Sequence, residues 1–239
     1  MENEKQQRSI QLDFEQQWLK KFSNGISKSL PAPICARIMR GSEFLTDDSN
    51  RDSVSAWSQR ALALLDDNCD PEIRQNIMSA CACHYPEDQL SDLKVAFEKT
   101  GDIAVPHQML QNQFENFLAD VLNLDHDTIA MIVERGWGAA GILNGNTITV
   151  IKIPKSGNLR EYFSTGDPLQ KRQLYCHCPR IREIMNVNQT ISRTYCYCGA
   201  SFYKNIWEVI TERQVEVKVD KSVLQGDDYC QISIQIAEQ

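Results

Sequence analysis

Apolar residues recur three or four positions apart through most of the first half of the chain. This spacing gives one apolar face to an α-helix. Helix boundary signals agree with it: Pro71 can open a helix at its first turn, and Gly101 follows an apolar-periodic stretch, as a helix-ending glycine does. We therefore expect helices over about 10–30, 53–65, 71–84, 87–99, 110–122 and 128–135, the last with Asp127 as its cap.

The second half changes to a period of two. Asn144-Gly145-Asn146 separates two short apolar stretches, which predicts a β-hairpin over about 141–153. Further expected elements are a short helix ending at Tyr175, a helix over 179–185, a strand over 190–195, a helix over 200–212, and an antiparallel hairpin at 215–219 and 230–236. The predicted fold is α+β. A helical region, residues 1–136, packs on a C-terminal antiparallel sheet with helices, residues 137–239.

Composition narrows the classes of protein. The chain has 239 residues, a net charge of −7 and 42% hydrophobic residues, which argues against nucleic-acid binding over a whole face. Its polar start has no signal-like apolar segment and no apolar stretch is long enough for a membrane span, so we expect a cytoplasmic protein. Residues 152–213, with 10 Lys/Arg against 5 Asp/Glu, could attract an anionic ligand.

Nine cysteines are unusual for a compartment that keeps thiols reduced, and they indicate metal or thiol chemistry. Six of them form three Cys-x-Cys pairs: Cys81/Cys83, Cys176/Cys178 and Cys196/Cys198. Two such pairs can supply four thiolates to a tetrahedral zinc ion. The second and third pairs are close in sequence, so Cys176, Cys178, Cys196 and Cys198 are the predicted ligands. Cys81, Cys83, His84 and His177 are second-rank candidates.

Three other interpretations of the cysteines stay open. The same thiols could hold an iron–sulfur cluster, which we consider the less favoured metal centre. Adjacent pairs could also perform thiol redox or metal-transfer chemistry. Alternatively, the cysteines could be unligated and buried as small apolar side chains.

Aromatic residues crowd the last Cys-x-Cys pair. Such a group can line a ligand pocket or pack a helix on a sheet. The candidate pocket residues are Tyr195, Tyr197, Tyr203, Trp207 and Cys230. Cys230 shares its strand face with Ile232, Ile234 and Ile236, which also fits a buried core thiol.

The end of the chain shows a family resemblance. The segment 195–203, the pair Trp207-Glu208, the alternating valines 215–219 and the turn Gly226-Asp227-Asp228-Tyr229-Cys230 resemble the closing helix and hairpin of 4-vinyl reductase (hydrocarbon-binding) domains. The L-2-amino-thiazoline-4-carboxylic acid hydrolase-like proteins are similar there. The resemblance covers roughly the last 45 residues. It implies an α+β domain that binds small, often apolar molecules, in some cases with a cysteine-linked metal.

These observations leave three hypotheses for function. The leading one is a small-molecule-binding or sensor-like protein with a cysteine-based zinc site, whose ligand is apolar or carboxylated. The alternative is a metal- or thiol-dependent hydrolase of a small cyclic amide or thiazoline-like substrate, which needs an open metal position or an activated thiol. The third is a thiol redox or metal-handling protein. The short apolar strands permit a homodimer.

Overall fold

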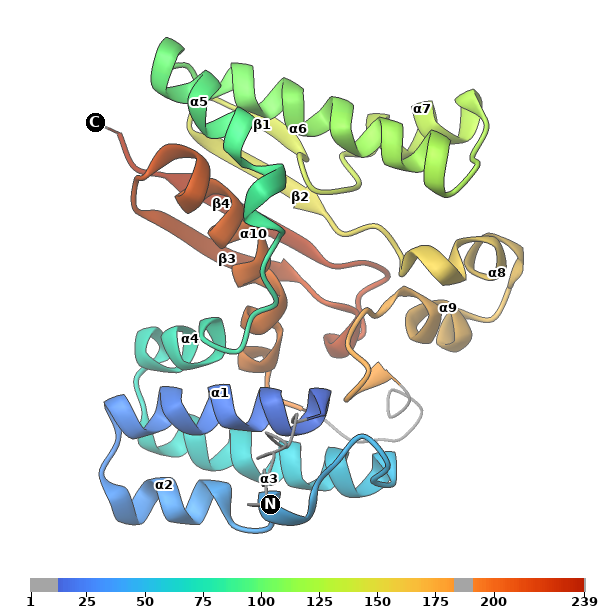
Figure 1. Ribbon diagram of the computed structural model, residues 1–239. Helices are drawn as coiled ribbons and strands as arrows, with labels where there is room; N and C mark the ends of the chain where they lie inside the picture. Colours follow the sequence, from blue (N-terminus) through green and yellow to red (C-terminus); the bar gives the residue numbers. More distant parts are fainter. Residues whose placement is uncertain (1–12, 183–190, 239) are drawn as a thin grey trace, which may run out of the picture.

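The computed structural model describes residues 13–182 and 191–238 (Figure 1). The fold is α+β, as predicted, with helices in the first half and a four-stranded antiparallel sheet in the second. The first half contains α1 (Phe14–Ser29), α2 (Ala32–Met39), α3 (Arg51–Asn68), α4 (Pro71–Ser79), α5 (Ser91–Thr100), α6 (Ala104–Asn116) and α7 (His126–Glu134). Short 3-10 turns lie at Ser42–Phe44 and Glu87–Gln89, and a π-helical turn, Phe117–Val121, continues α6.

The second half builds the sheet and its main covering helix. Its elements are β1 (Ile142–Asn144), β2 (Thr147–Ile151), α8 (Leu159–Ser164), α9 (Pro168–Tyr175), α10 (Tyr197–Thr211), β3 (Val215–Lys221) and β4 (Gln231–Ile236). Short 3-10 turns lie at Ser156–Asn158, Arg193–Cys196 and Val223–Gln225. The strand order is β1-β2-β4-β3, so the two predicted hairpins join through β2 and β4.

Five sequence predictions need correction. The predicted helix over 71–84 ends at Ser79, and a turn at residues 80–81 follows it. Pro31 and Pro33 end the first helix, but they also open α2, because proline is tolerated in the first turn. The last helix of the first half is α7, capped by Asp125 rather than Asp127. The predicted helix over 110–122 begins at Ala104. In the described part of the predicted 190–195 strand, a 3-10 turn over Arg193–Cys196 replaces it. The end of the predicted 179–185 helix lies outside the described residues.

One hydrophobic core includes residues from both predicted regions. On the sheet, Ile148, Val150, Ile232 and Ile234 alternate with more exposed neighbours, so one face is buried. Helix α10 packs against β3 and β4 on one side and against α4 and α5 on another. Figure 1 shows α1 to α4 at one end of the molecule, α5 to α7 at the other, and the sheet with α10 between them. Residues 1–136 and 137–239 therefore share their main core.

None of the described helices combines the length and the apolar character that a bilayer crossing needs.

Candidate functional site

Six cysteines from separate segments gather beside the first turn of α10. They are Cys81 after α4, Cys176 and Cys178 after α9, Cys196 and Cys198 at the start of α10, and Cys230 before β4. Each thiol is close enough to another member for its charge to change the neighbour's pKa. We call these six residues the thiol cluster. All of them are free cysteines; Cys81 is buried and the other five keep some solvent exposure.

Strand register places Cys230 opposite a lysine. Val150 pairs with Ile232, and Ile148 pairs with Ile234. Two positions further along, the backbone N–H of Lys152 donates to the Cys230 carbonyl oxygen at 3.0 Å. Because side chains alternate along strands, Lys152 and Cys230 continue the buried face of the sheet.

Tyr175 fixes Cys176 next to this strand pair. The Tyr175 side chain is fully buried. Its hydroxyl donates to the Lys152 carbonyl and accepts from the Cys230 N–H at 3.1 Å. Cys176, the next residue, is thereby placed beside Lys152 and Cys230.

Local hydrogen bonds orient the other thiols. The Cys178 sulfur lies 3.1 Å from the Tyr195 hydroxyl, and the Cys196 sulfur lies 3.0 Å from the Ser222 hydroxyl. The Cys198 thiol donates to the Cys81 carbonyl oxygen at 3.3 Å, which joins the N-terminal Cys-x-Cys pair to the C-terminal ones.

Two hydrogen-bond donors near the thiols, the Lys152 ammonium and the Trp18 indole N–H, have no strong acceptor among the described residues. The Lys152 ammonium lies close to Gly199, where an added Cβ would be 3.4 Å from Nζ. Within the described ranges, no carboxylate pairs with this ammonium and no side chain accepts a hydrogen bond from it. The buried indole N–H of Trp18 forms no well-aligned hydrogen bond in the described structure, but it lies near Cys198 and opposes the rise that burial causes in the pKa of that thiol.

Burial dominates the acidity of the thiols. It raises the pKa of Cys196 and of Cys198 to about 12, and it raises the pKa of Cys81, Cys176 and Cys230 as well. The charge of Lys152 opposes this effect on the pKa of Cys176, Cys196, Cys198 and Cys230, without overcoming it. At neutral pH these thiols are therefore protonated.

A fully buried ion pair borders the cluster. Arg180 contacts both carboxylate oxygens of Glu15, with distances of 2.8 and 2.9 Å, and neither side chain is exposed. Its guanidinium lies 3.7 Å from the centroid of the Trp18 ring and donates to the Tyr195 hydroxyl at 3.2 Å. The ion pair with Glu15 and the stacking on Trp18 offset the cost of burying the guanidinium, although its Nη2 forms no well-aligned hydrogen bond with the described residues.

The structure brings the four predicted zinc ligands together without arranging them around an ion. Over residues 13–182 and 191–238, no group of three or more His, Cys, Asp or Glu side chains is positioned to hold a metal. The sulfurs of Cys178, Cys196 and Cys198 each point to a different hydrogen-bond partner. Ligation would require these side chains to turn toward a common centre.

The second-rank candidates lie around the cluster. Cys83 and His84 are exposed, and His84 Nδ1 accepts from the Asn205 amide at 3.2 Å. His177 Nε2 lies 2.7 Å from the Ile153 carbonyl oxygen. The surrounding protein and the charge of Lys152 lower the pKa of His177 to about 4, so it is neutral at pH 7. Of this set, Cys81 belongs to the thiol cluster, and Cys83 lies near enough for its charge to act on the pKa of Cys198.

The predicted pocket aromatics are buried. Tyr195, Tyr197, Tyr203 and Trp207 belong to the main core. Trp207 stacks on His107, with 6.3 Å between ring centroids. Burial raises the pKa of the Tyr203 and Tyr195 hydroxyls, and the charges of Cys230 and Cys178, respectively, add to this rise, so both tyrosines border the thiol cluster.

The sequence interpretation missed Lys152, Arg180, Trp18 and Ser222. A signal existed for Lys152, which continues the alternation of Ile148 and Val150 on the buried strand face. No local signal marks Arg180, because its partner Glu15 is 165 positions away.

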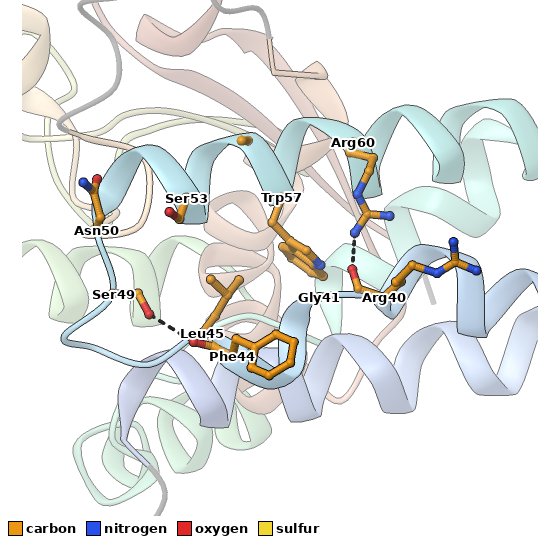
Figure 2. Close-up of a pocket in the computed structure, with 10 residues that line it drawn as sticks. Arg40, Gly41, Phe44, Leu45, Ser49, Asn50, Ser53, Trp57 and Arg60 are labelled. Carbon is orange, nitrogen blue, oxygen red and sulfur yellow. Dashed lines mark hydrogen bonds between the residues drawn. The ribbon is translucent and has the colours of Figure 1, made fainter.

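A surface hollow lies away from the cysteines. It has a volume of about 630 Å³ and is formed by the end of α2, the following turn and the first half of α3. Figure 2 shows Trp57 on its wall, with Phe44 and Arg40 near its rim. The Arg60 guanidinium donates to the Arg40 carbonyl and is therefore engaged with the backbone. The lining contains no acid–base or thiol group, so it offers no catalytic constellation.

Comparison with known proteins gives one match. The model of a family of unknown function (DUF6144) matches residues 155–239. No curated protein and no solved structure is significantly similar to the chain. The matched segment contains five of the six cluster cysteines, whereas Lys152, Cys81 and Trp18 lie before it.

Proposed function

We propose that the thiol cluster binds a thiophilic metal ion, with zinc as the first candidate, and that the loaded centre forms the binding site of a small-molecule-binding or sensor-like protein. The observation that carries this proposal is the convergence of six cysteines from four separate segments of the chain. Isolated core cysteines have no reason to meet in this way. Thiolate ligands select soft or borderline ions such as zinc.

Thiols that are protonated in the metal-free protein are compatible with a site in which the metal displaces their protons on binding. A metal replaces thiol protons with metal–sulfur bonds, so its binding releases protons. Buried, protonated thiols are weak nucleophiles. This favours metal binding over a mechanism that depends on a free thiolate, which is the thiol-dependent form of the hydrolase alternative.

Metal content of anaerobically purified protein, with an absorbance spectrum of the same sample, tests the proposal. We expect about one zinc per chain and no visible colour. Iron together with brown absorbance would indicate that the thiols hold an iron–sulfur cluster instead of zinc. Absence of metal together with fast-reacting thiols would overturn the proposal in favour of thiol redox chemistry.

Paired substitutions locate the site. The double variant Cys178→Ser/Cys198→Ser should lose most of the bound metal, since it removes one thiol from each C-terminal pair. Cys35→Ser/Cys69→Ser is the matched control. These two cysteines lie outside the cluster, and the Cys35 thiol donates to the backbone carbonyls of Ile26 and Leu30. Equal metal content in both double variants would remove Cys178 and Cys198 from the site.

A further inference from the structure

Lys152 is a charged residue beside the thiol cluster that has no counter-ion in the described structure. Its ammonium acts on the pKa of Cys176, Cys196, Cys198 and Cys230. The other cations near the cluster are engaged. Arg180 is paired with Glu15, and Lys21 Nζ donates to the Ala82 carbonyl at 2.9 Å.

The negative groups nearby do not neutralise Lys152. The charge of Asp227 acts on the pKa of Cys230, but among the described residues its carboxylate forms no ion pair with Lys152 and instead accepts a hydrogen bond from the Ser222 N–H at 2.8 Å. Tyr203 and the cysteines are neutral when protonated. One unpaired positive charge thus remains among the thiols, and the buried Trp18 N–H beside Cys198 is a second donor without an acceptor of good geometry.

Resting on the proposed function, we infer that Lys152 is the counter-charge of the loaded centre and that this centre carries a net charge of −1. A low-dielectric site favours a neutral total, because uncompensated charge there is costly. Three thiolates on a divalent ion, or two thiolates on a monovalent ion, each leave one negative charge. The thiol protons pass to solvent as the metal–sulfur bonds form.

This charge balance distinguishes the centre from a closed structural zinc site. Four thiolates on Zn²⁺ leave a charge of −2, which one lysine cannot neutralise. Three thiolates on Zn²⁺ leave a fourth position for water or for an incoming ligand. The thiol cluster then has the coordination of a ligand-accepting centre.

Anaerobic titrations with Zn²⁺ alone and with Cu⁺ alone test the stoichiometry. Thiols that ligate an ion are protected from alkylation, and mass spectrometry counts them and identifies their positions. We expect three protected cluster thiols for Zn²⁺ or two for Cu⁺. Four protected thiols on a single Zn²⁺ would overturn the inference.

Charge removal tests Lys152 directly. We expect Lys152→Met to weaken metal binding by about 10–100-fold, the range found when outer partners of metal ligands are removed. Lys152→Arg, which keeps the charge, should retain most of the affinity. Lys155→Met removes a nearby charge that acts on His177 and should stay within about threefold of wild type.

The two proposals fail in different ways. Wild-type protein that binds neither ion defeats the proposed function. Wild-type protein that binds an ion with an affinity unchanged by Lys152→Met defeats only the assignment of Lys152. Circular dichroism confirms folding; should Lys152→Met not fold, Lys152→Gln removes the same charge while keeping a polar side chain.

Discussion

Arg180 and Lys152 are two cations beside the same cysteines, and their surroundings differ. Arg180 is fully buried, paired with both oxygens of Glu15 and stacked on Trp18. Lys152 has no ion pair among the described residues and lies among neutral thiols. Arg180 is thus a cation whose charge is paired within the chain, whereas Lys152 has no charge partner among the described residues. In the proposal above, that partner is the loaded metal centre.

Removal of the Arg180 counter-ion should have the largest effect. Glu15→Gln leaves a buried guanidinium without its charge partner, which typically costs about 3–5 kcal/mol. Urea unfolding should therefore show a much lower midpoint with the same m-value. Glu98→Gln is the control, because the Glu98 side chain is half exposed and its ion pair with Lys94 is long, at 4.0 Å. A loss under 1 kcal/mol in Glu15→Gln would mean that the pair is not structural.

Lys152→Met should act in the opposite direction on the metal-free protein. Burial lowers the pKa of Lys152, and the ionised forms of Tyr203 and the neighbouring cysteines raise it, with a net shift upward. At neutral pH those neighbours are protonated and do not compensate the ammonium, so loss of this partly buried charge should raise the free energy of unfolding by about 1 kcal/mol. The measurement is urea unfolding under anaerobic conditions with a chelator present. The same substitution is expected to weaken metal binding, so stability and affinity should move apart. A destabilised metal-free variant would place Lys152 with Arg180, as a structural cation.

Substitution of His107 should have a smaller effect on the free energy of unfolding than the two changes above, and this effect depends on pH. Burial lowers the pKa of His107, with the Gly141 carbonyl 3.1 Å from Nε2 opposing that shift. The unfolded chain therefore takes up the proton first as the pH falls. The stability contribution is complete above the unfolded value of about 6.5 and is lost as pH falls through the lower folded value.

His107→Gln should accordingly flatten the decline in unfolding free energy below about pH 6.5. His126→Gln is the matched control, because His126 is almost fully exposed. Parallel pH profiles for wild type and His107→Gln, measured by urea unfolding from pH 8 to 5, would contradict the assignment.

Local signals predicted much of the fold. Asn144-Gly145-Asn146 marked the first hairpin, and Gly145 has the positive φ of 60° that such a turn uses. The short helix predicted to end at Tyr175 is α9, whose first turn is capped by the Asp167 side chain accepting from the Leu169 N–H. Alternation of valines and isoleucines identified β3 and β4 and their buried face. These features depend on neighbours in sequence, which is why sequence alone was sufficient.

The candidate site depended on contacts that local patterns do not encode. Cys-x-Cys spacing identified the thiols but not Lys152 or Trp18, whose roles come from strand register and from packing of α1. The aromatic residues near Cys198 were assigned to a pocket, yet the same apolar character also serves core packing. Composition could not separate these two uses of an aromatic side chain.

The contact between Cys198 and the Cys81 carbonyl spans 117 positions along the chain. During synthesis, Cys81 leaves the ribosome long before Cys198 exists. Contacts of such sequence separation form late, because loop closure comes before any gain from the contact. The Cys81/Cys83 pair therefore remains as free thiols during synthesis. The thiol cluster can assemble only when almost the whole chain has been translated.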